Sequence, residues 1–199
     1  MILDATAGNR KIWINKNDEN IIHIDIERGL EVKPTIFADN TQTPFQNDTF
    51  DTIFYDPPFA WNFKSMFFGF PNRTEQYKKY TTLGYRNCST SYYGVERYKS
   101  KTALISHVFK AQKEFCRILK NDGLLWVKWN ELRLKLDRVL PLFNDGWNEL
   151  MRLEIKDRSQ TLSETQTYWV VFTKKMMVTQ LSLTVTMNDV QIVEEVNQN

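Results

Sequence analysis

The segment Asp56-Pro57-Pro58-Phe59 directly follows the apolar run Thr52–Tyr55. The two prolines fix φ and lack N–H donors, so the backbone carbonyls of this corner and the Asp56 carboxylate are left as acceptors. Such acceptors orient the two N–H bonds of an exocyclic amino group and favour a tetrahedral nitrogen that can attack a methyl sulfonium. Phe59 would stack on the ring that carries the amino group. The alternative is a rigid Pro-Pro turn packed by an aromatic side chain.

Acidic residues close the first four predicted strands, at Asp4, Asp25, Asp39 and Asp56. In open α/β sheets, ligands bind beyond the carboxyl ends of the strands, so these carboxylates predict one shared pocket. Asp25 or Glu27 is suited to accept both ribose hydroxyls of an adenosine, and Asp39 the adenine amino group. Each carboxylate taken alone could instead cap the next helix or turn.

The turn around Gly8 follows the first strand, in the sequence Leu3-Asp4-Ala5-Thr6-Ala7-Gly8-Asn9-Arg10. A residue without Cβ lets the backbone approach a ligand closely, which favours a ligand contact at this turn. A lone glycine after a strand is also typical of a simple turn.

The segment 60–101 concentrates positive charge, with eight lysines and arginines against two glutamates, or +6. Eleven aromatic residues lie between these cations, a mixture that pairs phosphates with stacked, unpaired bases. A base extruded from its stack needs such a lid. The alternative is a solvated basic loop with a local aromatic core. The expected substrate-binding residues are Trp61, Lys78, Lys79, Tyr92, Tyr93 and Arg97, joined by Lys128 on the fifth strand.

The elements that must position these residues follow the pattern of an α/β fold with a mainly parallel sheet. A helix is predicted over Thr102–Leu119, ended by Asn121-Asp122-Gly123, and another over Glu131–Phe143, interrupted by Pro141. The polar stretch 11–20 is too short for a long first helix. The predicted strands are Ile2–Ala5, Ile21–Ile26, Thr35–Ala38, Thr52–Tyr55, Leu124–Trp129, Trp147–Ile155 and Thr167–Thr173, the last two forming an antiparallel hairpin.

The 199 residues suit one globular domain, and the whole-chain charge of +2 says little about partners. Two distant cysteines suit a reducing cytoplasm, and the absence of a leader or long apolar run argues against secretion or a membrane span. His23 and His107 are expected to be structural, and no metal site is predicted. The domain is assigned to residues 1–174 and the tail to 175–199, where 178–187 alternates like an edge strand.

These motifs together resemble a class I SAM-dependent methyltransferase of the amino-methylating group, whose signature [DNS]PP[YFW] is satisfied by Asp56 to Phe59. The chain is also similar to small bacterial and phage proteins with a DAxxGxRxxW opening and a KWNE segment, matched by Asp4–Trp13 and Lys128–Glu131. The resemblance implies a Rossmann-like, seven-stranded sheet and S-adenosyl-L-methionine (SAM) as cofactor. The positions implied for SAM binding are Asp4, Ala5, Gly8, Arg10, Asp25, Ile26, Asp39 and Asn40.

Arg10 departs from the resemblance, because the usual first SAM motif has a second glycine at this position. A cation beside a sulfonium is unfavourable, so Arg10 is expected to point away or to clamp the methionine carboxylate, and the clamp is favoured. We expect modest affinity for SAM.

The function predicted from these residues is methylation of an exocyclic amino group of a nucleobase in DNA or RNA. Adenine N6 is the first choice, with cytosine N4 and guanine N2 left open. Specificity would come from a structured RNA, a short site or a partner protein, and a homodimer is a further possibility. Two alternatives stay open: a glutamine-amide methyltransferase, and a non-catalytic nucleic-acid-binding subunit that has lost the cofactor.

Overall fold

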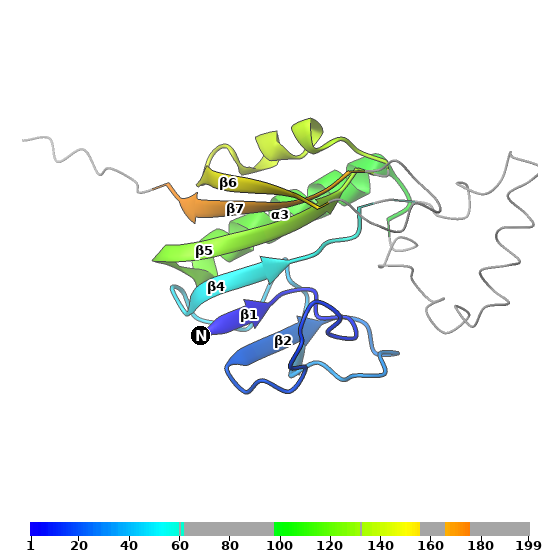
Figure 1. Cartoon of the computed structure of the whole chain (residues 1–199), viewed down its shortest axis with the longest axis vertical. Helices are drawn as coiled ribbons and strands as arrows, with labels where there is room; N and C mark the ends of the chain where they lie inside the picture. Colours follow the sequence, from blue (N-terminus) through cyan, green and yellow to red (C-terminus); the bar gives the residue numbers. More distant parts are fainter. Residues whose placement is uncertain (60, 62–97, 132, 156–165, 176–199) are drawn as a thin grey trace, which may run out of the picture.

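The computed structural model describes residues 1–59, 61, 98–131, 133–155 and 166–175, and within them seven strands form one sheet in the order β3-β2-β1-β4-β5-β7-β6 (Figure 1). The strands β1 to β5 pair in parallel, whereas β7 is antiparallel to both β5 and β6. This confirms the predicted mainly parallel sheet with a closing hairpin. The bounds are β1 Ile2–Asp4, β2 Ile21–Asp25, β3 Ile36–Phe37, β4 Phe50–Tyr55, β5 Leu119–Asn130, β6 Trp147–Ile155 and β7 Thr167–Lys174.

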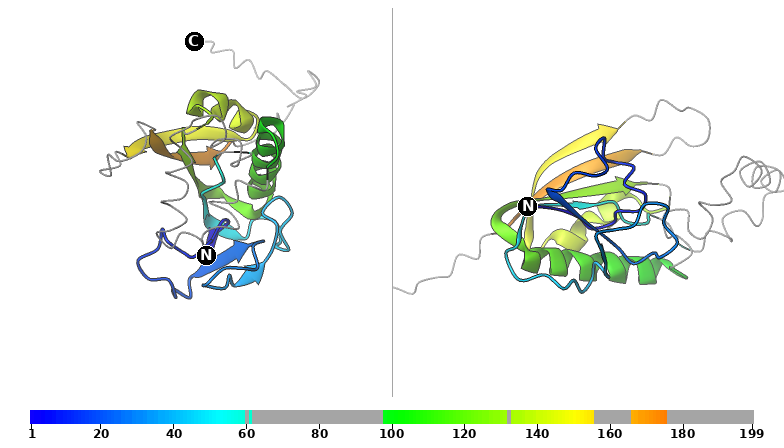
Figure 2. Two further views of the ribbon diagram at one scale, coloured as in Figure 1. Left: turned by 90° about the vertical axis from the view of Figure 1, so that its right-hand side faces the viewer. Right: turned by 90° about the horizontal axis from the view of Figure 1, so that it is seen from below.

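One face of the sheet is covered by the helix α3 (Lys101–Ile118) (Figure 2). Ser100 caps its first turn, with Oγ accepting from the Ala103 amide at 3.2 Å. The helix forms because apolar residues recur every three or four positions and place one face of the helix against the sheet. Its buried residues are Leu104, Val108, Ala111, Gln112, Phe115 and Ile118.

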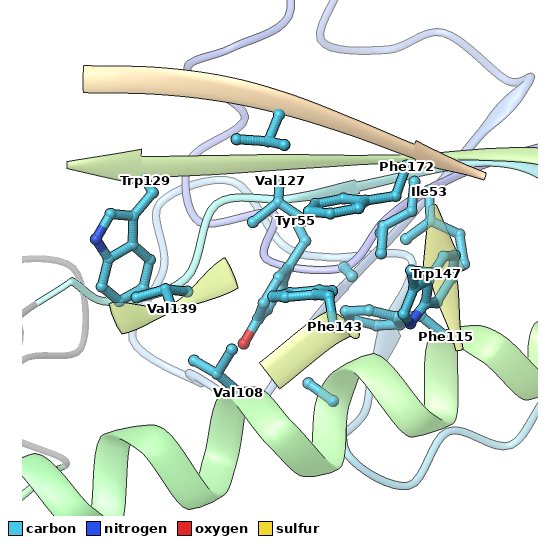
Figure 3. Packing of buried hydrophobic residues seen from close by; sticks show 14 of the residues in the cluster. Ile53, Tyr55, Val108, Phe115, Val127, Trp129, Val139, Phe143, Trp147 and Phe172 are labelled. Carbon is cyan, nitrogen blue, oxygen red and sulfur yellow. The ribbon is translucent and has the colours of Figure 1, made fainter. Parts of the chain in front are cut away.

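The core lies between the sheet and α3 and is rich in aromatic rings (Figure 3). Tyr55 of β4 meets Phe115 of α3 edge to face at 4.9 Å between ring centroids, and Phe143 stacks on Phe172 at 4.7 Å. Burial of each such side chain stabilises the fold by about 1.5–3 kcal/mol. These contacts hold β4 against the helix, and they thereby set the position of the residues that follow the carboxyl end of β4.

The opposite face of the sheet carries a second aromatic cluster, made of Trp13, Phe54, Trp126 and Trp169. Phe54 stacks on Trp126 at 5.7 Å, and Trp13 meets Phe54 edge to face at 5.0 Å. Trp169 contacts both Phe54 and Trp126, at 5.9 and 6.3 Å. Because side chains alternate along a strand, the residue two places beyond Trp126, Lys128, projects from this same face.

The predicted stop signal Asn121-Asp122-Gly123 does not end the helix, because it lies inside β5. The helix stops at Ile118, and Leu119 already has extended backbone and pairs with Phe50 of β4. Pairing with the central sheet overrides the local signal. The ladder is irregular between Phe50 and Thr52, where the extra residues of β5 are accommodated.

The predicted helix over Glu131–Phe143 is wrong, because the described residues of this segment form only the short 3₁₀ helices η3 (Leu136–Arg138) and η4 (Leu140–Phe143). The Glu131 carboxylate accepts from the Leu136 amide at 2.9 Å, and the Trp129 indole donates to the Leu134 carbonyl at 2.8 Å. These local bonds compete with a continuous helical ladder, and Pro141 removes a donor from it.

The remaining boundaries agree with the predictions in part. Residues 11–20 contain no helix, in agreement with the expectation that this stretch is too short for a long first helix. Helix α3 starts at Lys101, so the last residue assigned to the basic aromatic segment is helical. Positions 60, 62–97 and 176–199 lie outside the described residues, and with them most of that segment and nearly all of the tail. Among the described helices, none is long and apolar enough to cross a membrane.

Gly123 is a sensitive position for packing in β5. A Cβ at this residue would lie 2.7 Å from Leu119 Cγ and Cδ1 and 3.0 Å from the Asp51 carbonyl oxygen. Gly123→Ala should lower the free energy of unfolding by about 1–3 kcal/mol, measured by urea denaturation. Gly146→Ala is the matched control, because its Cβ would meet only Cys116 Sγ at 3.5 Å. Equal stability of the two variants would contradict the crowding at Gly123.

Candidate active site at the carboxyl ends of the central strands

The loops after β1 and β4 are joined by hydrogen bonds where the two strands end. The Ala5 amide donates to the Phe54 carbonyl at 2.8 Å, and the Asp56 amide donates to Thr6 Oγ1 at 2.7 Å. β1 and β4 are neighbours at the centre of the sheet, so the acidic corner and the glycine turn lie at one edge. This is the edge at which open α/β sheets bind ligands.

The Asp56 carboxylate forms an ion pair with Lys128, with Nζ 2.8 Å from Oδ2. The β4–β5 register pairs Tyr55 with Val127, which brings Lys128 opposite Asp56 at the end of the strands. Both side chains are largely withdrawn from solvent, 12% exposed for Asp56 and 26% for Lys128. Burial raises the pKa of Asp56, the Lys128 ammonium opposes that rise, and the nearby Asp4 adds to it.

Asp4 is buried beneath the first loop and holds it in place. Its carboxylate accepts from the Trp13 indole at 2.6 Å and from the Thr6 amide at 3.3 Å, and it lies 3.1 Å from His23 Nδ1. Asp4 and His23 are each 1% exposed. Asp4 therefore acts inside the protein on the loop that carries Thr6 and Gly8.

Gly8 has a left-handed backbone, with φ +48°, and donates its amide to Asp25 Oδ2 at 2.8 Å. Asp25 Oδ1 accepts from the Glu27 amide, also at 2.8 Å. A Cβ placed on Gly8 would meet no atom within 4 Å, so there is open space beside this turn. The left-handed φ favours glycine at this position, and the space allows a ligand to approach the backbone.

Arg10 also has a left-handed backbone, with φ 55°, a conformation that favours glycine and is uncommon for other residues. Its guanidinium donates to the backbone carbonyls of Lys16 and Lys33. The side chain thereby ties the first loop to the segment after β2. Both alternatives for Arg10, pointing away from a sulfonium and clamping a methionine carboxylate, stay predictions.

The loop after β3 reaches back to the end of β1. Asn40 Nδ2 donates to the Ala5 carbonyl at 3.1 Å, while Asn40 Oδ1 is buried with no hydrogen-bond partner among the described residues. Asp39 accepts from the Thr41 amide and hydroxyl at 2.9 and 2.8 Å. Ile26, just beyond β2, is 41% exposed. The predicted cofactor residues after the first three strands thus gather at one edge of the sheet.

The aromatic residues of the corner pack against the core. Pro57 is buried, whereas Phe59 and Trp61 are partly buried against the core cluster. The Arg133 guanidinium lies 5.3 Å from the centre of the Trp61 ring, a cation–π contact. Lys128, also predicted to bind substrate, pairs with Asp56. The remaining residues predicted to bind substrate lie outside the described residues: Lys78, Lys79, Tyr92, Tyr93 and Arg97.

Sequence reasoning missed three residues that hold the site together: Thr6, Trp13 and Arg133. Thr6 and Trp13 lie inside the DAxxGxRxxW opening, so the motif itself was the available signal. Arg133 follows KWNE closely, but nothing in the sequence places it on Trp61. In the described part of the chain, no group of three His, Cys, Asp or Glu residues could hold a metal ion.

Solved structures with a similar overall fold are found at low sequence identity. The PH0226 protein of Pyrococcus horikoshii OT3 is similar with a TM-score of 0.53, 13% identity, and coverage of 87% of this chain and 81% of that one. A TehB-like SAM-dependent methyltransferase of Corynebacterium glutamicum ATCC 13032 Kitasato is similar with a TM-score of 0.51 and 17% identity, and the match covers 87% of this chain and 79% of that one. The chain has the fold of class I SAM-dependent methyltransferases. No protein-family model and no curated protein matches the sequence.

The methyltransferase fold alone does not fix the reaction. The [4+2]-cyclase SpnF shares it with a TM-score of 0.52 and 11% identity, covering 87% of this chain and 74% of that one. The reaction therefore depends on the side chains at the strand ends.

Removal of the Lys128 ammonium should raise the pKa of Asp56 further, because the charge that opposes the effect of burial is lost. A carboxyl with a raised pKa holds its proton more readily in the folded chain, so its contribution to stability falls as pH rises from the ordinary Asp value to the folded value. Lys128→Met should cost about 2 kcal/mol at neutral pH, and this cost should shrink once acid protonates Asp56.

The measurement is ¹³C NMR of the Asp56 carboxyl during a pH titration, with urea unfolding at each pH. Lys120→Met is the matched control, because Lys120 of β5 pairs with Asp51 of β4 at 2.7 Å at the other end of the same strands. An unchanged titration of Asp56 in Lys128→Met would disprove the coupling.

Proposed function

We propose that this protein is a SAM-dependent methyltransferase acting on an exocyclic amino nitrogen of a nucleobase in DNA or RNA. Adenine N6 is the first target and cytosine N4 the second. The observation that carries the proposal is the Asp56 carboxylate, which is largely buried beside Pro57 at the end of β4 and paired with Lys128 at 2.8 Å. An acceptor in such a dry, preorganised position is what an amino substrate requires.

The strand ends offer groups that fit SAM. Open space adjoins the Gly8 backbone, and the buried Asn40 Oδ1 is an acceptor still available for a donor such as the adenine amino group. Asp25 keeps lone pairs for ribose hydroxyls beyond the two amides that it already accepts. When bound, SAM supplies a methyl group on a sulfonium, an electrophile that an amino nitrogen can attack.

The corner after β4 supplies what the amino group needs. The ion pair occupies Asp56 Oδ2, which leaves Oδ1 to accept one N–H. The backbone carbonyl of Pro57, the next residue in the chain, is the proposed acceptor for the other. The nitrogen must lose a proton as the new C–N bond forms. Asp56, whose pKa is raised by burial, is the nearby base that can take it. Phe59 would stack on the base.

Nucleic acid is the proposed partner because cations and aromatic side chains are mixed in the segment 60–101. Trp61 with Arg133 beside it extends this mixture to the described residues, since a guanidinium over an indole keeps its edge free to donate to phosphate.

Transfer of labelled methyl from SAM tests the proposal, with mixed RNA, genomic DNA and protein offered separately. Asp56→Ala should reduce transfer to nucleic acid by about a hundredfold or more, because an acceptor for the reacting amino group is lost. Asp51→Ala is the matched control, since Asp51 lies on the same strand and also pairs with a lysine of β5. Label that appears only in protein would favour the amide methyltransferase, and label that survives Asp56→Ala would contradict the assigned corner.

SAM binding can be tested apart from catalysis by isothermal titration. Gly8→Ala meets no steric obstacle but forces a left-handed alanine, so it should cost about 1–2 kcal/mol of stability. It should also weaken SAM binding by about tenfold or more, because the methyl group enters the space beside the backbone. Gly146→Ala should leave binding unchanged. Wild-type protein that binds no SAM would support the non-catalytic alternative.

A further inference from the structure

Lys128 presents hydrogen-bond donors immediately beside the acceptor that Asp56 presents. Its ammonium carries three N–H bonds, and one is directed to Asp56 Oδ2 at 2.8 Å. Two donors are therefore left next to the Asp56 carboxylate. The side chain is 26% exposed, so these donors can still be reached from outside. The end of the β4–β5 pair thus offers an acceptor and a donor side by side.

We propose that Asp56 and Lys128 read two neighbouring atoms of the substrate together, the amino group and the ring nitrogen next to it. This rests on the proposed function and narrows its substrate class. Asp56 accepts from the amino group, while Lys128 donates to the unprotonated ring nitrogen. Adenine presents this pair as N6 and N1, and cytosine as N4 and N3. Lys128 is then a specificity residue.

The strand holds Lys128 firmly enough for such selection. β5 is paired on both sides, with β4 and with β7, and Lys128 lies opposite Trp169 in the β7 register. Two residues earlier, Trp126 is stacked on Phe54, and one residue later the Trp129 indole is bonded to a backbone carbonyl. Because Trp126 and Trp129 hold the backbone on both sides of Lys128, the ammonium is presented from one position. A hydrogen bond that the ammonium loses to the substrate is therefore not easily replaced.

Asp56 and Lys128 together also distinguish an amino group that lies beside a ring acceptor from an amino group that does not. A base whose ring atom beside the amino group is C–H offers Lys128 no acceptor, so a buried donor is left unpaired when that base binds. The loss of a hydrogen bond to a charged group corresponds to about a ten- to hundredfold decrease in kcat/KM. The same decrease is expected whether the acceptor is removed from the base or the donor from the protein.

Nucleoside analysis of the labelled product first identifies the target base. The experiment then replaces this base in an oligonucleotide acceptor. For adenine, 1-deazaadenine removes the N1 acceptor and 7-deazaadenine serves as the matched substrate that keeps it; for cytosine, 3-deazacytosine is compared with cytosine. Wild-type protein should use the substrate without the acceptor at least tenfold less well by kcat/KM. In Lys128→Met, the ratio of the two kcat/KM values should fall to the intrinsic difference in reactivity between the two bases.

Two further variants keep the test independent of folding. Lys128→Arg retains donors and should keep part of the discrimination, whereas Lys120→Met, at the other end of the same strand pair, should keep all of it. Thermal denaturation establishes that each variant is folded.

The outcomes separate this inference from the proposed function. No methyl transfer to any nucleic acid by the wild type overturns both. Transfer to adenine or cytosine with the same discrimination in wild type and Lys128→Met overturns the role of Lys128 alone, as does equal use of both substrates by the wild type. Transfer to a protein amide would overturn the pair of amino group and ring nitrogen, because an amide side chain has no ring nitrogen. Transfer to guanine N2 would overturn the choice of adenine or cytosine, because guanine presents the same pair as N2 and N3.

Discussion

The parallel pairing of β1 with β4 is the constraint on which the rest of the site depends. These two short strands lie at the centre of the sheet, and the Ala5 and Asp56 amides are bonded across them, to the Phe54 carbonyl and Thr6 Oγ1. The first loop and the acidic corner are therefore one structural unit. A shift of either strand would separate the space beside Gly8 from the Asp56 carboxylate.

Two carboxylates are taken out of water at this edge, and each has its own compensation. Asp4 is surrounded by the Trp13 indole, the Thr6 amide and His23, and it supports the loop from below. Asp56 is paired with Lys128 instead and keeps an oxygen for other donors. Because the charge of Asp4 contributes to the raised pKa of Asp56, a change at Asp4 would also change the pKa of Asp56.

The fold and the chemistry rest on different parts of the protein. The likeness to solved structures extends over 87% of the chain at 11–17% identity, so it reflects the layout of the sheet more than shared side chains. The cyclase among these structures illustrates how a common sheet can serve another reaction. In this protein, the proposed amino methylation rests on the corner Asp56 to Phe59 and on Lys128 opposite it.

The sequence by itself determined the succession of strands along the chain, the helix α3, and the corner at Asp56, because these follow from local periodicity and from proline chemistry. It failed where tertiary contacts override local signals, at Asn121-Asp122-Gly123 and over Glu131–Phe143. Only the tertiary structure decided that Lys128 pairs with Asp56, 72 residues away, and that Arg10 reaches the Lys33 carbonyl. Such contacts depend on which strands are neighbours in the sheet and on the register in which they pair. The local spacing of residues in the sequence predicts neither.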